Sequence, residues 1–422
     1  MSFTSGRSRW GDISVVSVAQ LLSGVGTFLV MTGQVLAFQH RAASGTEVAA
    51  LIICEALPMV VLGKPAGWLV DRVDSRVLLV VAGLVQAGAC IGLSVTTQLS
   101  STLAGVLVLS AAAAVSMPTR QALLPAMAVR DDLPRAAAFV QTAGSLGMMA
   151  GPALAGLLFG YLGAQGTVRV ATVGFVATVV AAFAVRTRRG TRASQADAHA
   201  TPALVAPGSS TVEKWGLHSD AMLRVVVWGM AAVVSAVSAV NVVLVFFVMG
   251  TLHSQPRTYG VIDATWMLGI LVGSWLFGFT VRPSTRDSAM ARRLLIGAAV
   301  ISTSFVAVGS VRGAWWVVPC YVVGGAANGG INVLAMTLLG RRVPPAARGR
   351  AGAAIMARTQ GGSVLGYVAG GLLLDVAQPR WIVLGCGILG ALTALAILPI
   401  VGRVATADVR SRTPQPSSVG AL

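Results

Sequence analysis

Charged side chains are scarce in this 422-residue chain, at 11% of its residues, and only 14 of them are Asp or Glu. A soluble domain of this length needs a polar surface that so few charges do not supply, and 55% of the residues are hydrophobic. The composition therefore indicates a polytopic membrane protein. The net charge of +17 would suit a nucleic-acid binder, but no basic soluble domain carries it. Arginines in loops that face anionic lipid explain the charge better, so we expect no nucleic-acid partner.

Cysteine and histidine are also rare, with four of each. The cysteines lie singly in apolar segments without paired spacing, so we interpret them as core residues and not as disulfides or metal ligands. The histidines fall in loops or at helix ends. No nucleotide-binding loop of the type Gly-x-x-x-x-Gly-Lys-Ser/Thr occurs, which excludes ATP as an energy source bound by this chain. We expect no catalytic centre, no metal and no cofactor, and hence a protein that is not an enzyme.

Long apolar runs are abundant. A helix of about 20 apolar residues crosses the hydrocarbon core of a bilayer. Runs of suitable length lie near residues 12–39, 47–70, 77–97, 101–124, 136–163, 167–186, 221–250, 258–281, 289–311, 314–339, 351–376 and 380–402. They predict an all-α integral membrane protein with twelve transmembrane helices.

Polar segments divide the chain. The expected parts are an N-terminus (1–11), a six-helix half (12–186), a linker (187–220), a second six-helix half (221–402) and a tail (403–422). If both termini lie inside the cell, the outer loops hold five of the 31 basic residues, which are Arg41, Arg169, Arg257, Arg312 and Arg380. This asymmetry predicts cytoplasmic termini, linker and tail, and a multi-pass protein of the cell membrane.

The two halves contain an internal repeat. The pattern Gly147-x-x-x-Gly151-x-x-x-x-Gly156-Leu-Leu recurs 215 residues later as Gly362-x-x-x-Gly366-x-x-x-x-Gly371-Leu-Leu. The repeat is degenerate elsewhere, because the loop between the eighth and ninth runs has Gly278 and Arg282 without an Asp between them.

A short charged loop joins the second and third runs, with the sequence Gly67-Trp-Leu-Val-Asp71-Arg72-Val-Asp74-Ser-Arg76. It resembles the loop between helices 2 and 3 of major facilitator superfamily transporters, although Asp74 replaces the usual Gly. The pattern Asp-Arg-x-Asp-x-Arg occurs in some drug and siderophore exporters, of the macrolide-efflux or enterobactin-exporter type. The resemblance implies two pseudo-symmetric six-helix halves in the major facilitator fold.

The resemblance also implies a role for Asp71. In this family the Asp contacts the cytoplasmic start of helix 11, here 349–352, with an Arg of helix 4 nearby, for which Arg120 is the candidate. Such a contact would latch the cytoplasmic side closed, and a helix N-terminus suits a carboxylate. Gly67, with Gly63, would let helices approach closely. Arg72 and Arg76 are either gating residues or topology signals.

Helix 5 carries Gly147, Gly151, Pro152 and Gly156, which resemble the helix-5 motif of antiporters in this superfamily. The repeat places Gly362 and Gly366 at equivalent positions in helix 11. Small residues at this spacing permit close helix packing, and Pro bends a helix. Simple packing is the alternative explanation, but the motif favours export.

Ionisable residues inside the spans are few, so each is a candidate. Glu55 precedes Asp71 by 16 residues, about 24 Å along a helix, and is a candidate proton carrier or a hydrogen-bonded packing residue. Asp263 is either a second titrating group or solvated at the membrane interface. Arg358 would bind an anionic group, neutralise an acid or extend to the cytoplasmic surface.

Uncharged polar residues supply the candidate substrate cavity, because the family fold lines its cavity with helices 1, 4, 7 and 10. Gln20, Ser23, Thr27 and Gln34 share one face of helix 1. The cavity candidates are Gln20, Thr27, Gln34, Asn241, Asn328, Asn332 and Arg358. Hydrogen bonding between helices is the alternative role.

These features predict a secondary active transporter that exports a small organic molecule, such as an antibiotic, another drug or a siderophore, by alternating access and proton antiport. The expected partners are the substrate, protons and the lipid bilayer, and the protein is expected to be a monomer. An importer or facilitator on the same fold, or a transport-like membrane sensor, is the alternative.

Overall fold

The computed structural model describes residues 8–129, 132–185, 187, 220–280, 285–344 and 348–412, and the regular structure in these segments is helical. The elements in chain order are α1 (Trp10–His40), α2 (Gly45–Val61), α3 (Gly63–Arg72), α4 (Ser75–Val95), α5 (Leu99–Met127), α6 (Leu133–Ala184), α8 (Ala221–Val245), the π-helix η2 (Phe246–Thr251), α9 (Pro256–Thr280), α10 (Asp287–Ser310), the 3₁₀-helix η3 (Ala314–Trp316), α11 (Val317–Arg342), α12 (Arg348–Leu374) and α13 (Pro379–Arg412).

These helices provide the twelve expected spans. Nine helices in the described segments are long and apolar enough to cross a membrane. One of them, α6, contains two spans, because the chain turns at Gly163, where φ is +65°. The remaining two spans are α12 and the pair α2–α3. The twelve-helix prediction is confirmed.

The second span is broken, which the apolar run did not indicate. Leu62 ends α2 and begins α3, and its N–H donates to the carbonyl of Pro58 at 2.8 Å. Pro58 crowds the preceding turn, and Pro65 cannot donate to the carbonyl one turn before it. The helix therefore restarts at Gly63, with α3 packed on α5 and α2.

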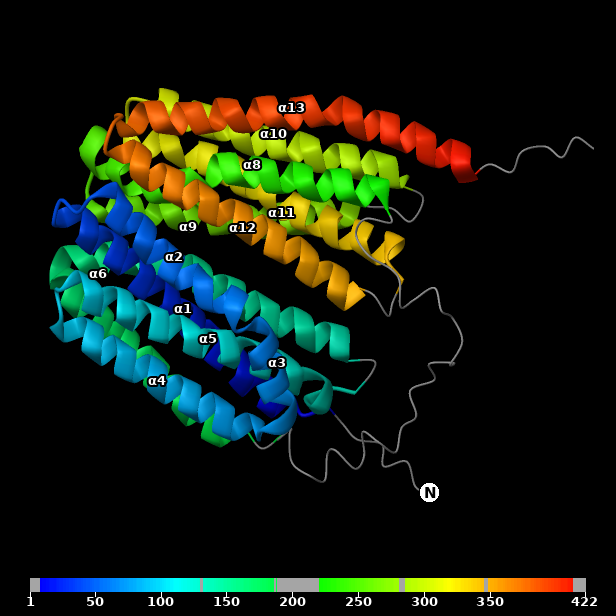
Figure 1. The fold of residues 1–422 in the computed structure, drawn as a ribbon. Helices are drawn as coiled ribbons and strands as arrows, with labels where there is room; N and C mark the ends of the chain where they lie inside the picture. Colours follow the sequence, from blue (N-terminus) through cyan, green and yellow to red (C-terminus); the bar gives the residue numbers. More distant parts are fainter. Residues whose placement is uncertain are drawn as a thin grey trace, which may run out of the picture.

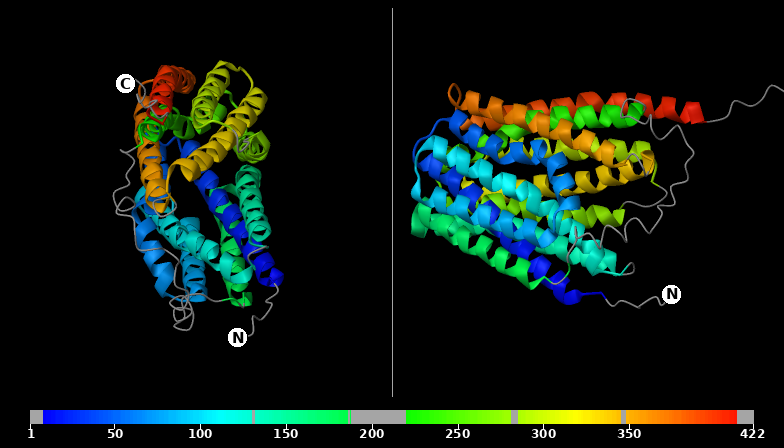
Figure 2. Two further views of the ribbon diagram at one scale, coloured as in Figure 1. Left: turned by 90° about the vertical axis from the view of Figure 1, so that its right-hand side faces the viewer. Right: turned by 60° about the horizontal axis from the view of Figure 1, so that its bottom comes forward.

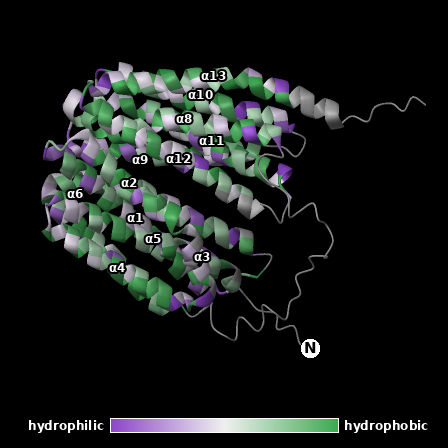
Figure 3. Cartoon of the chain, viewed as in Figure 1, coloured by the Kyte–Doolittle hydropathy of each residue, from purple (hydrophilic) through white to green (hydrophobic). Residues whose placement is uncertain are grey.

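The helices form two groups that lie side by side, α1–α6 and α8–α13 (Figure 1; Figure 2). Hydrophobic residues cover most of the length of the helices, and hydrophilic residues gather toward the helix ends (Figure 3). Large apolar side chains on the outside, such as Phe183 and Trp275, are more than half exposed. Such a surface suits contact with lipid.

The repeated glycines are packing positions in both halves. A Cβ on Gly147 would meet the backbone of Leu21, and one on Gly151 would meet Phe28, so these glycines pack α6 against α1. Gly362 and Gly366 pack α12 against α8 in the same way, on the backbone of residues 231–239. The sequence repeat is therefore also a repeat of helix contacts.

The two halves meet closely at one end of the bundle, which we term the closed end. There Gly156 of α6 lies against Gly260 of α9, and Gly371 of α12 lies against Gly45 of α2. The opposite end carries α3 and is termed the α3 end. Toward the α3 end the ribbons of the two halves spread apart (Figure 1).

The expected close packing at Gly63 and Gly67 is wrong for this conformation. A Cβ at either position would meet no atom within 4 Å. Because the chain breaks at Leu62, α3 leaves the line of α2, and Trp68 on α3 is 56% exposed.

Candidate functional site

Two acidic side chains, one from each half, lie within the apolar helices of the bundle. Glu55 lies on α2 and Asp263 on α9, and the charge of Asp263 acts on Glu55. The hydroxyl of Thr32 on α1 donates to Oδ2 of Asp263 at 3.3 Å, again across the two halves. Asp263 thus has a hydrogen-bond partner in the other half, and its role as a titrating group stays a prediction.

Three of the four tyrosines of the chain lie within electrostatic range of one of these acids. Tyr259 and Tyr321, which are 4% and 5% exposed, are in range of Asp263, and Tyr367 of α12 is in range of Glu55. None of these three tyrosines was among the residues predicted from the sequence, and the scarcity of tyrosine was the signal that could have found them.

An aromatic cluster supports Asp263 from within the second half. The ring of Trp266, on α9, stacks on Phe305 of α10 with the ring centres 5.6 Å apart, and it meets Tyr321 of α11 edge to face at 5.3 Å. Such pairs stabilise a defined arrangement of rings. These ring contacts hold α9, the helix that carries Asp263, against α10 and α11.

The pair has a clear chemical consequence. Like charges repel each other more strongly in a low-dielectric interior than in water. Binding or release of a proton on Glu55 therefore changes the energy of Asp263. Any movement of one half relative to the other alters this interaction.

The cavity candidates divide into two groups. Asn241 and Asn332 are exposed, and Asn241 lies beside Tyr367, close to the acidic pair. Gln34 is buried, and Thr27 and Asn328 are half-buried. These five remain candidates for contact with a substrate.

The other two cavity candidates have partners within their own half. Gln20 accepts a hydrogen bond from Nε of Arg120 at 2.5 Å. Arg358 lies over the ring of Trp228, 5.4 Å from its centre, and donates to the carbonyl of Ala354. No carboxylate partner of Arg358 occurs among the described residues.

The gating candidates of the first half make contacts within that half. Arg72 lies over Trp68, 4.2 Å from the ring centre, and Nη2 of Arg76 donates to the carbonyl of Val185. Arg120 is bound to α1. The side chain of Asp71 and those of 348–350 lie outside the described part, so the proposed latch stays a prediction.

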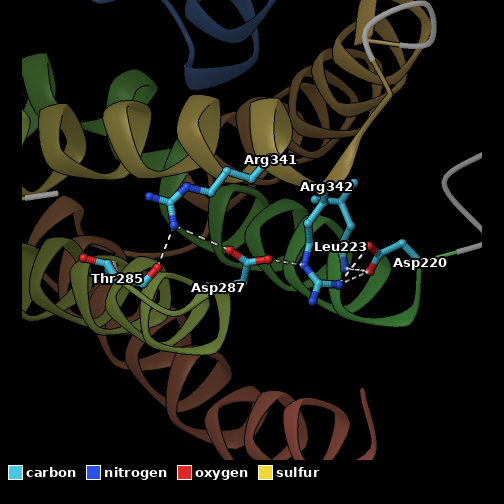
Figure 4. Close-up of polar contacts among 6 residues, drawn as sticks. All are labelled: Asp220, Leu223, Thr285, Asp287, Arg341 and Arg342. Atoms are coloured by element: carbon cyan, nitrogen blue, oxygen red, sulfur yellow. Dashed lines mark hydrogen bonds and ion pairs between the residues drawn. The ribbon is translucent and has the colours of Figure 1, made fainter. Parts of the chain in front are cut away.

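The α3 end of the second half contains an ion-pair network that the sequence analysis missed (Figure 4). Arg342, at the end of α11, binds Asp220 before α8 at 2.9 Å and Asp287 on α10 at 3.0 Å. Arg341 donates to the carbonyl of Thr285. Asp287 is the first residue of α10. The second copy of the charged loop, around Gly278 and Arg282, lacks an Asp, so a search a few residues further along the sequence would have found Asp287.

Comparison with known proteins agrees with this architecture. The family description "Major Facilitator Superfamily" matches residues 16–281 and, in a second match, 226–420. A curated relative, the uncharacterized MFS-type transporter YfiS of Bacillus subtilis (strain 168), is 23% identical over 393 residues, which is 91% of each chain.

Solved structures share the fold at low sequence identity. A point mutant of the nucleoside transporter NupG superposes with a TM-score of 0.74 at 14% identity, covering 92% of this chain and 99% of its own. A bacterial homologue of the human lysosomal transporter Spinster gives 0.68 at 13% identity, covering 96% and 97%. A point mutant of a peptide transporter POT gives 0.71 at 14% identity, covering 96% of both. With matches that span nearly the whole chain and twelve helices in two halves, the protein belongs to the major facilitator superfamily, a family of membrane transporters.

Proposed function

We propose that this transporter exports a small organic molecule across the cell membrane in exchange for protons. The observation that carries the proposal is the hydrogen bond from Thr32 on α1 to Asp263 on α9, which gives an acid of one half a partner in the other half, with a second acid, Glu55, inside the first half. In alternating access the halves move relative to each other, so an acidic pair shared between them experiences each state differently. That difference couples protonation to the movement.

Charge supports an orientation. The α3 end carries most of the arginines of the described helices, including Arg76, Arg341 and Arg342, whereas the closed end carries the five outer-loop arginines named above. The positive-inside rule then assigns the α3 end, with both termini, to the cytoplasm. In this orientation the conformation described here is closed toward the outside.

The direction of transport rests on α6. Its Gly147, Gly151, Pro152 and Gly156 resemble the antiporter motif, and they form the contacts of α6 with α1 and α9. We expect an antibiotic, another drug or a siderophore as the substrate, carried by a monomer. An importer on the same fold is the competing function.

The substrate is found first, by screening a deletion strain for hypersensitivity to an antibiotic panel and for loss of metabolite secretion. The compound identified is then tested in proteoliposomes with an imposed proton gradient. We expect Glu55→Gln and Asp263→Asn each to abolish proton-driven accumulation, because each substitution removes one of the two carboxyl groups that carry the proton. Exchange of labelled for unlabelled substrate should continue in both variants.

The control is Glu47→Gln, in the first turn of α2 and away from the pair, which should transport like the wild type. Proton-driven transport at the wild-type rate in both acid variants would refute the role of the pair. An importer would instead accumulate the substrate only when the proton gradient has the opposite direction. A comparison of inverted with right-side-out vesicles would identify it.

A further inference from the structure

A small cavity lies inside the first half, among α1, α4, α5 and α6. Its volume is about 20 Å³, which is room for one occupant the size of a water molecule. Its polar lining consists of Gln86, Ser116, Arg120 and Thr178, and the remaining lining is apolar. None of the residues of the acidic pair lines it.

The cation in this cavity is Arg120, and no carboxylate forms an ion pair with it among the side chains that the structure describes, which do not include that of Asp71. Arg120 is 7% exposed, and its hydrogen bonds go to Gln20 and Ser23, both of them neutral. Asp12 lies on the same helix as Gln20, but it accepts hydrogen bonds from the backbone N–H and the hydroxyl of Thr187 instead. A buried guanidinium with only neutral partners is energetically costly inside a membrane.

The cavity also contains an unused donor. Gln86 is 1% exposed, and its Nε2 has no hydrogen-bond partner in the described part of the chain. The two hydroxyls in the lining donate elsewhere, Ser116 to the carbonyl of Ala113 and Thr178 to that of Phe175. Gln86 and Arg120 are therefore the groups that can donate to an occupant.

A second guanidinium lies nearby. Nη2 of Arg76 donates to the carbonyl of Val185, and Val185 itself lines the cavity. Two guanidinium groups thus lie at or beside the cavity, and such cations favour a negative occupant.

We propose that this cavity binds one chloride ion, held between the guanidinium of Arg120 and the amide of Gln86. A water molecule would satisfy Nε2 of Gln86 but would leave the charge of Arg120 uncompensated. A monatomic anion of similar size satisfies both. The ion joins α4 to α5 and stabilises the helices of the first half, and it does so independently of substrate transport.

The first test is thermal unfolding of the purified protein in detergent, in sodium chloride or sodium bromide against sodium gluconate at equal ionic strength. A ligand that binds only the folded state raises its stability with increasing concentration. We expect the halides to raise Tm in a saturable manner relative to gluconate. The absence of a halide-specific rise would overturn the proposal.

Two substitutions at one position separate anion binding from packing. Gln86→Leu removes the donor, and Gln86→Glu supplies a tethered carboxylate that replaces the ion beside Arg120. We expect both variants to lose the halide-dependent rise, and Gln86→Glu to have the higher Tm of the two in gluconate. The matched control is Gln34→Leu, which removes another buried glutamine of the same half and should keep the rise. A full halide effect in Gln86→Glu would contradict the assignment.

Bromide locates the site directly. Crystals of the wild-type protein grown in sodium bromide should give an anomalous difference peak between Arg120 and Gln86. A cavity that holds only an ordered water, without anomalous signal, would refute the proposal.

Discussion

Arg342 is almost completely buried at the α3 end, with 4% of its side chain exposed, and it binds two carboxylates from different helices. Removal of one member of a buried ion pair leaves the remaining charges without compensation, at a cost of about 3–5 kcal/mol. We therefore expect Arg342→Met to lower the free energy of unfolding by that amount. Thermal denaturation of the purified variant in detergent measures the loss.

The neighbouring arginine is the control for this prediction. The side chain of Arg341 is 28% exposed, and its nitrogen lies 3.8 Å from Asp287. Exposed pairs contribute about 0–1 kcal/mol, so Arg341→Met should change stability little. Equal losses in the two variants would show that the network does not act through the burial of Arg342.

Some single residues of the candidate site could be identified from the sequence. Glu55 and Asp263 stand out because acids are rare inside apolar runs, and each was a candidate on that ground alone. The contact of Asp263 with the other half was not predictable, because it depends on how the two halves are placed. Thr32 and Asp263 are 231 positions apart and hydrogen-bonded. No local pattern encodes such a contact.

At the scale of helices, the contact of α6 with α9 holds the closed end together. A Cβ on Gly156 would lie 2.6 Å from the carbonyl oxygen of Pro256 and close to the backbone of Gly260. Backbone atoms cannot move aside as a flexible side chain does, so Gly156→Ala should force the two helices apart. We expect this variant to shift the population toward a state that is open at this end.

Spin-label distances between Thr97→Cys and Arg312→Cys, in a background without the native cysteines, would report the opening. Both positions are exposed near the closed end. The matched control is Gly160→Ala, one turn further along α6, where a Cβ would meet no atom within 4 Å. A distance distribution unchanged in Gly156→Ala would show that this contact does not determine the state.

The helices themselves were largely predictable, since a bilayer fixes the length of an apolar span. The exceptions are positions at which tertiary packing or backbone geometry determines where a helix breaks or turns. The break at Leu62 required knowledge of how Pro58 and Pro65 act together. At Gly163 the chain turns between two membrane spans, although both spans belong to the single element α6. The repeated glycines make close helix contacts, since close helix approach requires small residues wherever it occurs.

At the scale of the whole molecule, the halves touch at the closed end and spread apart at the α3 end (Figure 2). Alternating access requires a second state in which this arrangement is reversed. The predicted contact of Asp71 with the start of α12 belongs to that second state, because it would join the halves at the α3 end. Asp71 should therefore have little influence on the conformation described here.

The substitution Asp71→Asn tests the predicted latch between the halves. A carboxylate at a helix N-terminus contributes about 0.3–2 kcal/mol, so its loss should destabilise the second state by that amount and enrich the present one. Spin labels at Val129→Cys and Arg286→Cys, which are exposed on opposite halves at the α3 end, should show a larger long-distance fraction than in the wild type. Asp74→Asn is the control, because Asp74 accepts a hydrogen bond from the N–H of Arg76 and caps α4 within its own half. If Asp74→Asn shifts the distances and Asp71→Asn does not, the charged loop stabilises the first half and the latch between the halves has to be sought elsewhere.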